Sequence, residues 1–179
     1  MTDAKLGVQP TTLGFYLSLY DYPKTAEERE HMSKVPYVSV VGSLMYVMLC
    51  KHLNICFALG MFSRYQVNLG LRHWQAVKHI LRYLKRTRDY MIVYSRENLT
   101  PVGYTDSDFQ TYKDSKKSMS KNVFALGHGA IAWISVKQTC NIDSTIEAEY
   151  VAASKATKEA IWLRKFITDS EVNPSMKKL

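Results

Sequence analysis

The sequence predicts an α+β fold in which a helical region precedes an antiparallel sheet with a long helix across one face. Three observations predict it. Apolar residues recur at helical spacing within residues 37–88, and short β-type runs separated by turn residues follow residue 89. A capped amphipathic stretch then begins at Ser144. Helical patterns followed by strand patterns are typical of the α+β class.

Residues 1–36 are expected to form a mostly irregular lead-in with one short helix. Pro23 and Pro36 bracket a charged patch, KTAEERE, and proline is tolerated only at helix ends. The next run, YVSVVGSLMYVMLC at 37–50, is apolar but shorter than the ~20 residues that a spanning helix needs, so it predicts a buried helix. The N-terminus lacks the pattern of a secretory signal, so we expect an intracellular protein, cytoplasmic or nuclear, without a membrane partner.

Residues 71–86 are predicted to form an amphipathic helix. Trp74, Val77, Ile80, Leu81 and Leu84 recur at spacings of three and four and define its apolar face. The other face is basic, with aromatic Trp74 and Tyr83 interleaved. Its candidate nucleic-acid-binding residues are Arg72, Lys78, Arg82, Lys85, Arg86 and Arg88.

Two interpretations of this basic face remain open. A charge run on a helix is usually a solvated face. Solubility is served equally well by mixed charges, however, whereas this run has one sign. The chain as a whole carries a net charge of +8, which favours polyanions such as nucleic acid, although solubility alone also explains that charge.

Four β-type runs follow the basic helix: MIVY at 91–94, PVGYTD at 101–106, NVFALG at 122–127 and AIAWISV at 130–136. Only His128 and Gly129 separate the last two runs, with Gly127 just before them, and this punctuation predicts a hairpin turn. We interpret His128 as a solvated turn residue rather than as a ligand.

A long helix is predicted from Ser144 to about residue 169. The motif STIE at 144–147 has the spacing of a capping box, in which the Ser144 hydroxyl and the Glu147 carboxylate each accept a backbone N–H. An apolar stripe follows, suited to lying close on a sheet. It consists of Ala148, Val151, Ala152, Ala156, Ala160, Leu163 and Ile167.

Two carboxylates are candidate metal ligands. Asp106 ends an apolar strand, and Glu149 lies in the first turn of the long helix, where Glu147 is already used by the cap. If the helix packs on the sheet the two can converge, and hard oxygen ligands without nearby His or Cys suit Mg²⁺ or Mn²⁺. The alternative is simple solvation, because Asp and Glu are abundant on any protein surface.

The motifs HWQAVKHILRYLKRT, GYTDSDFQ, GAIAWISVKQ and DSTIEAEYVAASKATKEAIWLRKFI occur in one order and at characteristic intervals. Together they resemble the C-terminal part of the Pol polyprotein of copia-type LTR retrotransposons of plants, over about residues 35–170. The resemblance implies that residues 37–88 are a helical reverse-transcriptase connection-like subdomain. It implies that residues 89–179 are a truncated ribonuclease H-like fold, a three-stranded antiparallel sheet with a long helix packed across it.

The resemblance also implies an activity. Ribonuclease H of that family uses carboxylates to hold two Mg²⁺ ions at the scissile phosphate of RNA in an RNA/DNA hybrid. Its strand aspartate falls on Asp106 and its helix glutamate on Glu149, which are therefore the expected catalytic and metal-binding residues. Lys137 and Gln138 belong to its WxxxKQ motif and are expected near the duplex. Trp133 opens that motif, and we favour a core position for it over one at the duplex.

Departures from the family pattern predict an impaired site. A third aspartate, in a Cys-Asp-Asn motif on a further strand, does not appear before Leu179, so we expect weakly bound Mg²⁺ or Mn²⁺ and an open edge beside the strand of Asp106. A family Ser-Gly pair appears as Ser120-Lys121, a loss that matters only where glycine supplies positive φ. The catalytic aspartates of the polymerase are absent, so we expect no polymerase activity.

Three hypotheses therefore remain. The chain is a ribonuclease H-type endonuclease fragment with impaired catalysis, a non-catalytic basic nucleic-acid binder from a decayed or domesticated retroelement, or a product without a cellular role. The expected partners are an RNA/DNA hybrid or other nucleic acid and the rest of the Pol polyprotein, without a small-molecule cofactor. Three cysteines form neither a disulfide framework nor a zinc motif.

Overall fold

The computed structural model of the chain describes residues 9–11, 17–96, 99–112 and 114–170. It divides into two compact units, unit 1 (Met1–Met91) and unit 2 (Ile92–Leu179). Each unit has its own buried residues.

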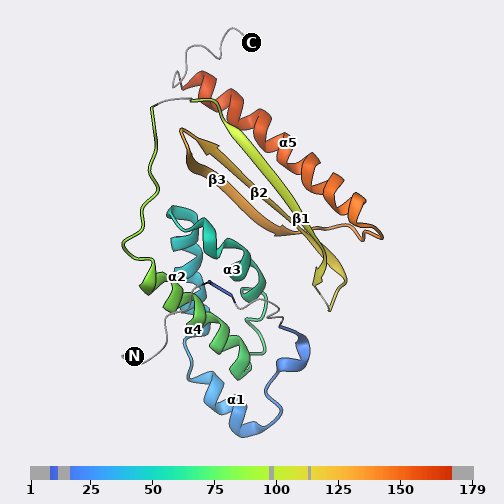
Figure 1. The fold of residues 1–179 in the computed structure, drawn as a ribbon. Coiled ribbons are helices and arrows are strands. Elements are labelled where there is room, and N and C mark those ends of the chain that lie inside the picture. The colour runs from blue at the N-terminus through green and yellow to red at the C-terminus, as the bar shows by residue number, and fades with distance from the viewer. Residues whose placement is uncertain (1–8, 12–16, 97–98, 113, 171–179) are drawn as a thin grey trace. The chain divides into compact units, whose positions relative to one another are not determined.

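Unit 1 is helical (Figure 1). Its elements are two 3₁₀ turns, η1 (Leu19–Asp21) and η2 (Leu53–Ile55), and the helices α1 (Ala26–Ser33), α2 (Tyr37–Cys50), α3 (Cys56–Phe62) and α4 (Leu71–Arg86). The short helix predicted between the two prolines is confirmed as α1. It starts at a capping box, because the Thr25 hydroxyl accepts the Glu28 N–H and the Glu28 carboxylate accepts the Thr25 N–H.

Helix α2 confirms the predicted helix but corrects its predicted burial. Tyr37, Val41 and Leu44 are buried on one face, whereas Tyr46 and Leu49 on other faces are 72% and 68% exposed. An apolar run thus need not be enclosed on all sides. Among the described residues, no single helix has both the length and the apolar character to cross a bilayer; α1 and α2 reach that threshold only as a pair bent by 48°.

The core of unit 1 is closed by contacts between its helices. The Tyr37 hydroxyl donates to the carbonyl oxygen of Phe62 at 2.8 Å, and burial raises the pKa of this phenol.

On α4 the bounds 71–86 are confirmed, but the buried face is rotated from the predicted one. His73, Ala76 and Tyr83 are buried beside Val77 and Ile80, whereas Trp74, Leu81 and Leu84 are only half-buried.

His73 explains part of this rotation. Its Nδ1 accepts the Gly70 N–H at 3.1 Å at the start of α4, and its ring lies 4.6 Å from that of Tyr65. Burial lowers the pKa of His73, so the imidazole is neutral inside the core. The His73 ring is therefore buried because it accepts a hydrogen bond from the start of its own helix. Hydrophobicity alone would have predicted the neighbouring Trp74 in the core instead.

Unit 2 is a sheet with one long helix. Three antiparallel strands, β1 (Val102–Tyr112), β2 (Lys117–Leu126) and β3 (Gly129–Lys137), lie in the order β1-β2-β3, and α5 (Thr145–Asp169) crosses one face and contacts β1 and β2 (Figure 1). The predicted α+β class with a three-stranded sheet and a long helix is confirmed.

The β-type run at 91–94 is not a strand, so that prediction is wrong. The segment has no regular secondary structure and lies outside the ladder. It still contacts the sheet, because the Ser95 N–H donates to the Gly127 carbonyl oxygen at 2.7 Å and the Tyr94 hydroxyl donates to the Ala130 carbonyl oxygen at 2.8 Å. β-propensity marks residues that fit beside a sheet as well as residues within it.

The predicted hairpin turn is confirmed, with Gly127 and His128 as its two central residues. Both residues have positive φ, +54° and +69°, and Leu126 pairs with Gly129 across them. Two successive positive φ values are the signature of a type I′ turn, whose twist matches the flanking strands.

The start of α5 confirms half of the predicted capping box. The Ser144 hydroxyl accepts the Glu147 N–H at 3.2 Å, but the Glu147 carboxylate accepts the N–H of Asp143 rather than that of Ser144. Beyond the cap, Ala148, Ala152, Leu163 and Ile167 of the predicted stripe are buried.

Candidate functional site

Asp106 lies on the face of the sheet that α5 does not cover. In the β1–β2 pairing, Asp106 is opposite Lys121, and the next residue, Ser107, is opposite Ser120. Ser120 faces α5, because its hydroxyl accepts from the Gln138 amide that also donates to a backbone carbonyl of α5. Side chains alternate between the two faces of a strand, so Asp106 points to the other face.

Lys121 holds two carboxylates on that face. Its Nζ lies 3.3 Å from Oδ2 of Asp106 and makes a closer ion pair with Oδ2 of Asp108, two residues along the same strand. Burial on its own would lower the pKa of Lys121, but the carboxylates of Asp108 and Asp106 outweigh it and raise the pKa above its usual value. The ammonium therefore stays charged between them.

Lys121 stands where the family resemblance has glycine, and the substitution costs no backbone strain. Among the described residues other than glycine, positive φ is confined to Gln110, Lys116 and His128. Lys121 instead pairs regularly with Asp106 on one side and Ser135 on the other, within the middle strand of the sheet. No left-handed conformation is needed at this position.

The donor set around Asp106 does not fit the pair of Mg²⁺ ions that the resemblance implies. Within the part of the chain that the structure describes, no group of three or more His, Cys, Asp or Glu side chains is placed to hold a metal ion. Mg²⁺ requires near-octahedral oxygen ligands, and the two carboxylates on β1 are already engaged by an ammonium group.

Glu149 lies on α5, which covers the opposite face of the sheet. It follows Ala148, which is fully buried against the sheet, and its own side chain is exposed. The structure therefore does not bring Glu149 and Asp106 together across the sheet face on which α5 packs. Joint binding of one ion by these two residues stays a prediction. It requires the Asp106 side chain to turn around the outer edge of β1, which is an edge strand.

The basic residues of α4 form a stripe opposite its buried face. Lys78, Arg82 and Lys85 recur at i, i+4 and i+7, and the helix contains no acidic residue. Lys85 is exposed, and Lys78 and Arg82 are half-buried. Nζ of Lys78 lies 6.0 Å from the centroid of the Trp74 ring, at the outer limit of a cation–π contact. We call Lys78, Arg82 and Lys85 the α4 basic stripe.

The remaining basic candidates differ from one another. Arg86 and Arg88 are exposed at the end of α4, and Arg88 pairs with its neighbour Asp89 at 3.3 Å. Arg72 donates to Oδ1 of Asp21 at 2.5 Å. Burial opposes ionisation of Asp21, but the Ser18 N–H and Arg72 outweigh it and lower the pKa of this carboxyl. The charge of Arg72 is thus compensated within unit 1.

Tyr83 was predicted to lie on the basic face of α4, but it does not. Its ring is buried, and its hydroxyl accepts from the side-chain amide of Asn54 at 3.0 Å. A partial rotation of α4 about its own axis is enough to move an aromatic residue from the surface into the core.

The structure places Gln138, which was expected near a duplex, in the interior of unit 2 rather than at its surface. Gln138 is fully buried, and its Nε2 donates to Ser120 Oγ and to the carbonyl oxygen of Ala148, both at 2.9 Å. This amide joins β2 to α5 and has no access to an external ligand. Lys137 is half-buried, with Nζ 5.2 Å from the Tyr112 ring centroid. Trp133 is also half-buried, between the two positions considered for it.

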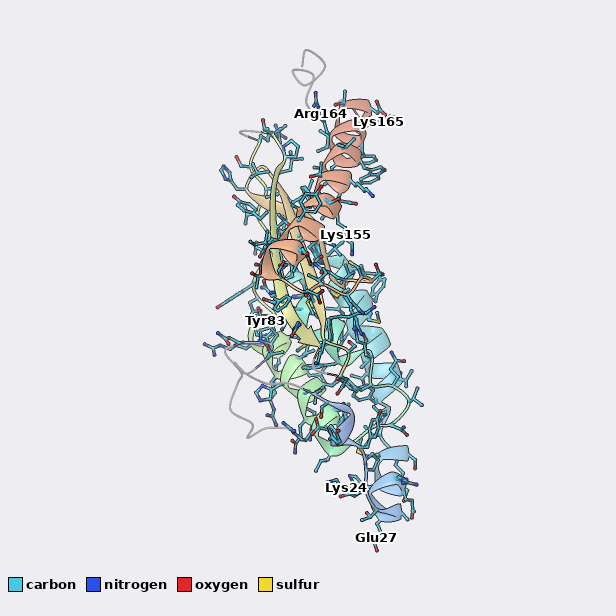
Figure 2. The ribbon with its side chains drawn as sticks, turned by 90° about the vertical axis from the view of Figure 1, so that its right-hand side faces the viewer. Lys24, Glu27, Tyr83, Lys155, Arg164 and Lys165 are labelled. Atoms are coloured by element: carbon cyan, nitrogen blue, oxygen red, sulfur yellow. The ribbon has the colours of Figure 1, made fainter. Side chains whose placement is uncertain are left out.

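Sequence reasoning missed Lys121 as a partner of Asp106. Its only sequence signal is a lysine in a β-type region, and cross-strand register cannot be read from one strand alone. It also left aside the basic residues of α5, of which Lys155, Arg164 and Lys165 are labelled in Figure 2. The helix also carries acidic residues, among them Glu147, Glu149 and Glu159, so its charges are of mixed sign.

Comparisons with known proteins find long relatives. The sequence is 43% identical over 169 residues to the "Retrovirus-related Pol polyprotein from transposon TNT 1-94" of Nicotiana tabacum, covering 94% of this chain and 13% of that protein. It is 32% identical over 170 residues to the corresponding polyprotein from transposon RE1 of Arabidopsis thaliana, covering 94% of this chain and 11% of that protein. The chain thus spans only a small part of these relatives.

One relative is short. The "Secreted RxLR effector protein 161" of Plasmopara viticola is 39% identical over 133 residues, which cover 74% of this chain and 94% of that protein. No family model matches the sequence, and no solved structure matches it.

Proposed function

Since the chain belongs to the Pol polyproteins of copia-type plant retrotransposons, as its motifs predicted, we propose that it is a Pol-derived fragment that binds an RNA/DNA hybrid without cutting it. In this proposal, unit 1 is the reverse-transcriptase connection and contacts the hybrid. Unit 2 is of ribonuclease H ancestry, with Asp106 and Glu149 as the residues descended from the nuclease site.

The α4 basic stripe carries the binding proposal. Lys78, Arg82 and Lys85 span seven residues, about 10 Å of helix at ~1.5 Å per residue. That length corresponds to about three phosphates of one strand, which are spaced by ~3.4 Å along a duplex axis. Three cations on one line, without an acidic residue in the helix, match a phosphate backbone better than they match a mixed protein surface.

We propose no cleavage because of how the side chains around Asp106 are arranged. Two-metal hydrolysis needs ligands that hold two ions about 3.5–4 Å apart. Asp106 and Asp108 are instead paired with Lys121, and Glu149 is carried by the helix on the opposite face. The proposal therefore assigns the chain a binding role and no hydrolytic step.

The binding arm of the test removes the α4 basic stripe. Fluorescence anisotropy with a labelled RNA/DNA hybrid would compare the wild type with the triple variant K78Q/R82Q/K85Q. Three phosphate contacts contribute about 2.7 to the salt slope, or an about forty-fold loss of affinity between ~50 and ~200 mM salt. We expect the variant to lose that part of the salt dependence.

A control with the same change in charge is K158Q/R164Q/K165Q on α5, where all three side chains are exposed. It should keep the wild-type salt slope. Equal losses in both triple variants would mean that only net charge matters, and that α4 is not the binding surface.

The cleavage arm uses the same hybrid with Mg²⁺ or Mn²⁺. We expect no cleavage by the wild type. Cleavage that disappears in both Asp106→Asn and Glu149→Gln would instead establish a ribonuclease H and reject this part of the proposal. Cleavage of equal rate in all three proteins would come from a contaminating nuclease.

A further inference from the structure

We propose that Lys121 is a built-in cation for Asp106 and Asp108, which neutralises this acidic pair and keeps divalent metal ions from binding to it. The two carboxylates lie two residues apart on one face of β1, and the lysine comes from the adjacent strand. The proposal thus assigns the lysine the role that a bound metal ion would otherwise have on this face.

The register of the sheet makes the contact possible. Lys121 is directly opposite Asp106 and diagonal to Asp108, whose own partner is Met119. Cβ atoms of directly opposite residues are about 4.5–5.5 Å apart and diagonal ones about 7–8 Å, so a long lysine side chain reaches both carboxylates. The ion pairs from Lys121 Nζ to Oδ2 of each aspartate show that it does.

The surroundings strengthen these ion pairs. The side chain of Lys121 is 29% exposed, and that of Asp108 is 39% exposed, so neither is fully solvated. Met119, which neighbours both on this face, is fully buried. A charge pair that is partly shielded from water is screened less by salt than a fully exposed pair.

The same geometry opposes a divalent ion. A cation that approached Oδ2 of either aspartate would come within a few ångströms of the ammonium and be repelled by it. Displacing the ammonium would leave a charged lysine without its partners in a partly buried place, which is costly. The carboxylates are therefore satisfied without a metal ion.

This inference deepens the proposed absence of cleavage and rests on that part of the proposed function. It is independent of hybrid binding by α4, which belongs to unit 1. A failure of either one can be recognised, because metal binding at Asp106 and hybrid affinity at the α4 basic stripe are measured separately.

The test removes the charge and keeps a long, unbranched side chain. Lys121→Met is compared with the wild type in the full chain, with Mn²⁺ as the probe. Binding is measured by loss of the free Mn²⁺ signal in electron paramagnetic resonance, and thermal unfolding is followed with Mn²⁺ and with a chelator. We expect Lys121→Met to bind Mn²⁺ at least about ten-fold more tightly than the wild type, and to be stabilised by Mn²⁺ where the wild type is not.

Two further variants complete the experiment. Lys121→Arg keeps a cation and should behave as the wild type does. The triple variant K121M/D106N/D108N should lose the Mn²⁺ binding that Lys121→Met gains, which locates the ion at these carboxylates.

Two results would overturn the proposal: Mn²⁺ affinity in Lys121→Met that is no tighter than in the wild type, or wild-type Mn²⁺ binding that disappears in D106N/D108N. The second comparison needs only variants that keep Lys121. It therefore decides the question even where Lys121→Met fails to fold.

Discussion

Replacement of Gln138 separates a structural role from a ligand-binding role. The side chain is fully buried, and its Nε2 donates to Ser120 Oγ and to the Ala148 carbonyl oxygen. Its Oε1 is buried without a hydrogen-bond partner among the described residues. Gln138→Ala and Gln138→Met remove the same polar groups but leave different volumes, so comparing them isolates the contribution of packing.

The expected sizes follow from these contacts. Both variants lose two hydrogen bonds, worth about 1 kcal/mol each, and both gain about 1–2 kcal/mol because the unpaired Oε1 is removed. Gln138→Ala also leaves a cavity, for which we add about 2 kcal/mol. We therefore expect Gln138→Ala to destabilise by about 2–3 kcal/mol and Gln138→Met by about 1 kcal/mol at most.

Thermal and chemical unfolding of the full chain measure these differences, and about 2 kcal/mol corresponds to roughly 4–8 °C in a protein of this size. Affinity for the RNA/DNA hybrid should be unchanged in both variants below their unfolding transitions. If Gln138→Ala unfolds as the wild type does but loses hybrid affinity, the side chain reaches the ligand and the reasoning from burial is refuted.

Three other substitutions test local features of the fold. Ser144→Ala removes the oxygen that accepts the Glu147 N–H, and unfolding measurements should show a loss of about 1 kcal/mol, whereas no loss would mean that the cap is replaced by water. Gly127→Ala places a Cβ 2.2 Å from the Ser95 carbonyl oxygen at φ +54° and should cost more than about 1 kcal/mol. Its control is Gly42→Ala in α2, where a Cβ meets nothing within 4 Å and a gain of about 0.5–1 kcal/mol is expected. Since the pKa of Asp21 is lowered in the folded protein, its contribution to stability is present above the unfolded pKa of about 3.9 and is lost as pH falls through the folded value. Asp21→Asn should therefore lose stability at neutral pH and show a shallower decline below about pH 4, and an identical acid limb in both proteins would contradict this assignment.

The sequence by itself determined the elements whose signals are local. The helix at 71–86 has the predicted bounds, because periodic apolar residues and the surrounding turn residues lie within one short segment. The Ser144 cap and the Gly127-His128 turn are likewise encoded by a few adjacent residues. The family was identified from the order of several long motifs, which does not depend on side-chain geometry.

Only the tertiary structure decided where the functional side chains point. Asp106 faces Lys121 rather than α5, and Gln138 is inside rather than at a surface. The buried face of α4 includes His73 and Tyr83 and leaves Trp74 only half-buried. Each depends on the register of one strand, or the rotation of one helix, against a partner distant in sequence. Because strand side chains alternate with a period of two, a shift of one residue in register moves a carboxylate to the other face of the sheet.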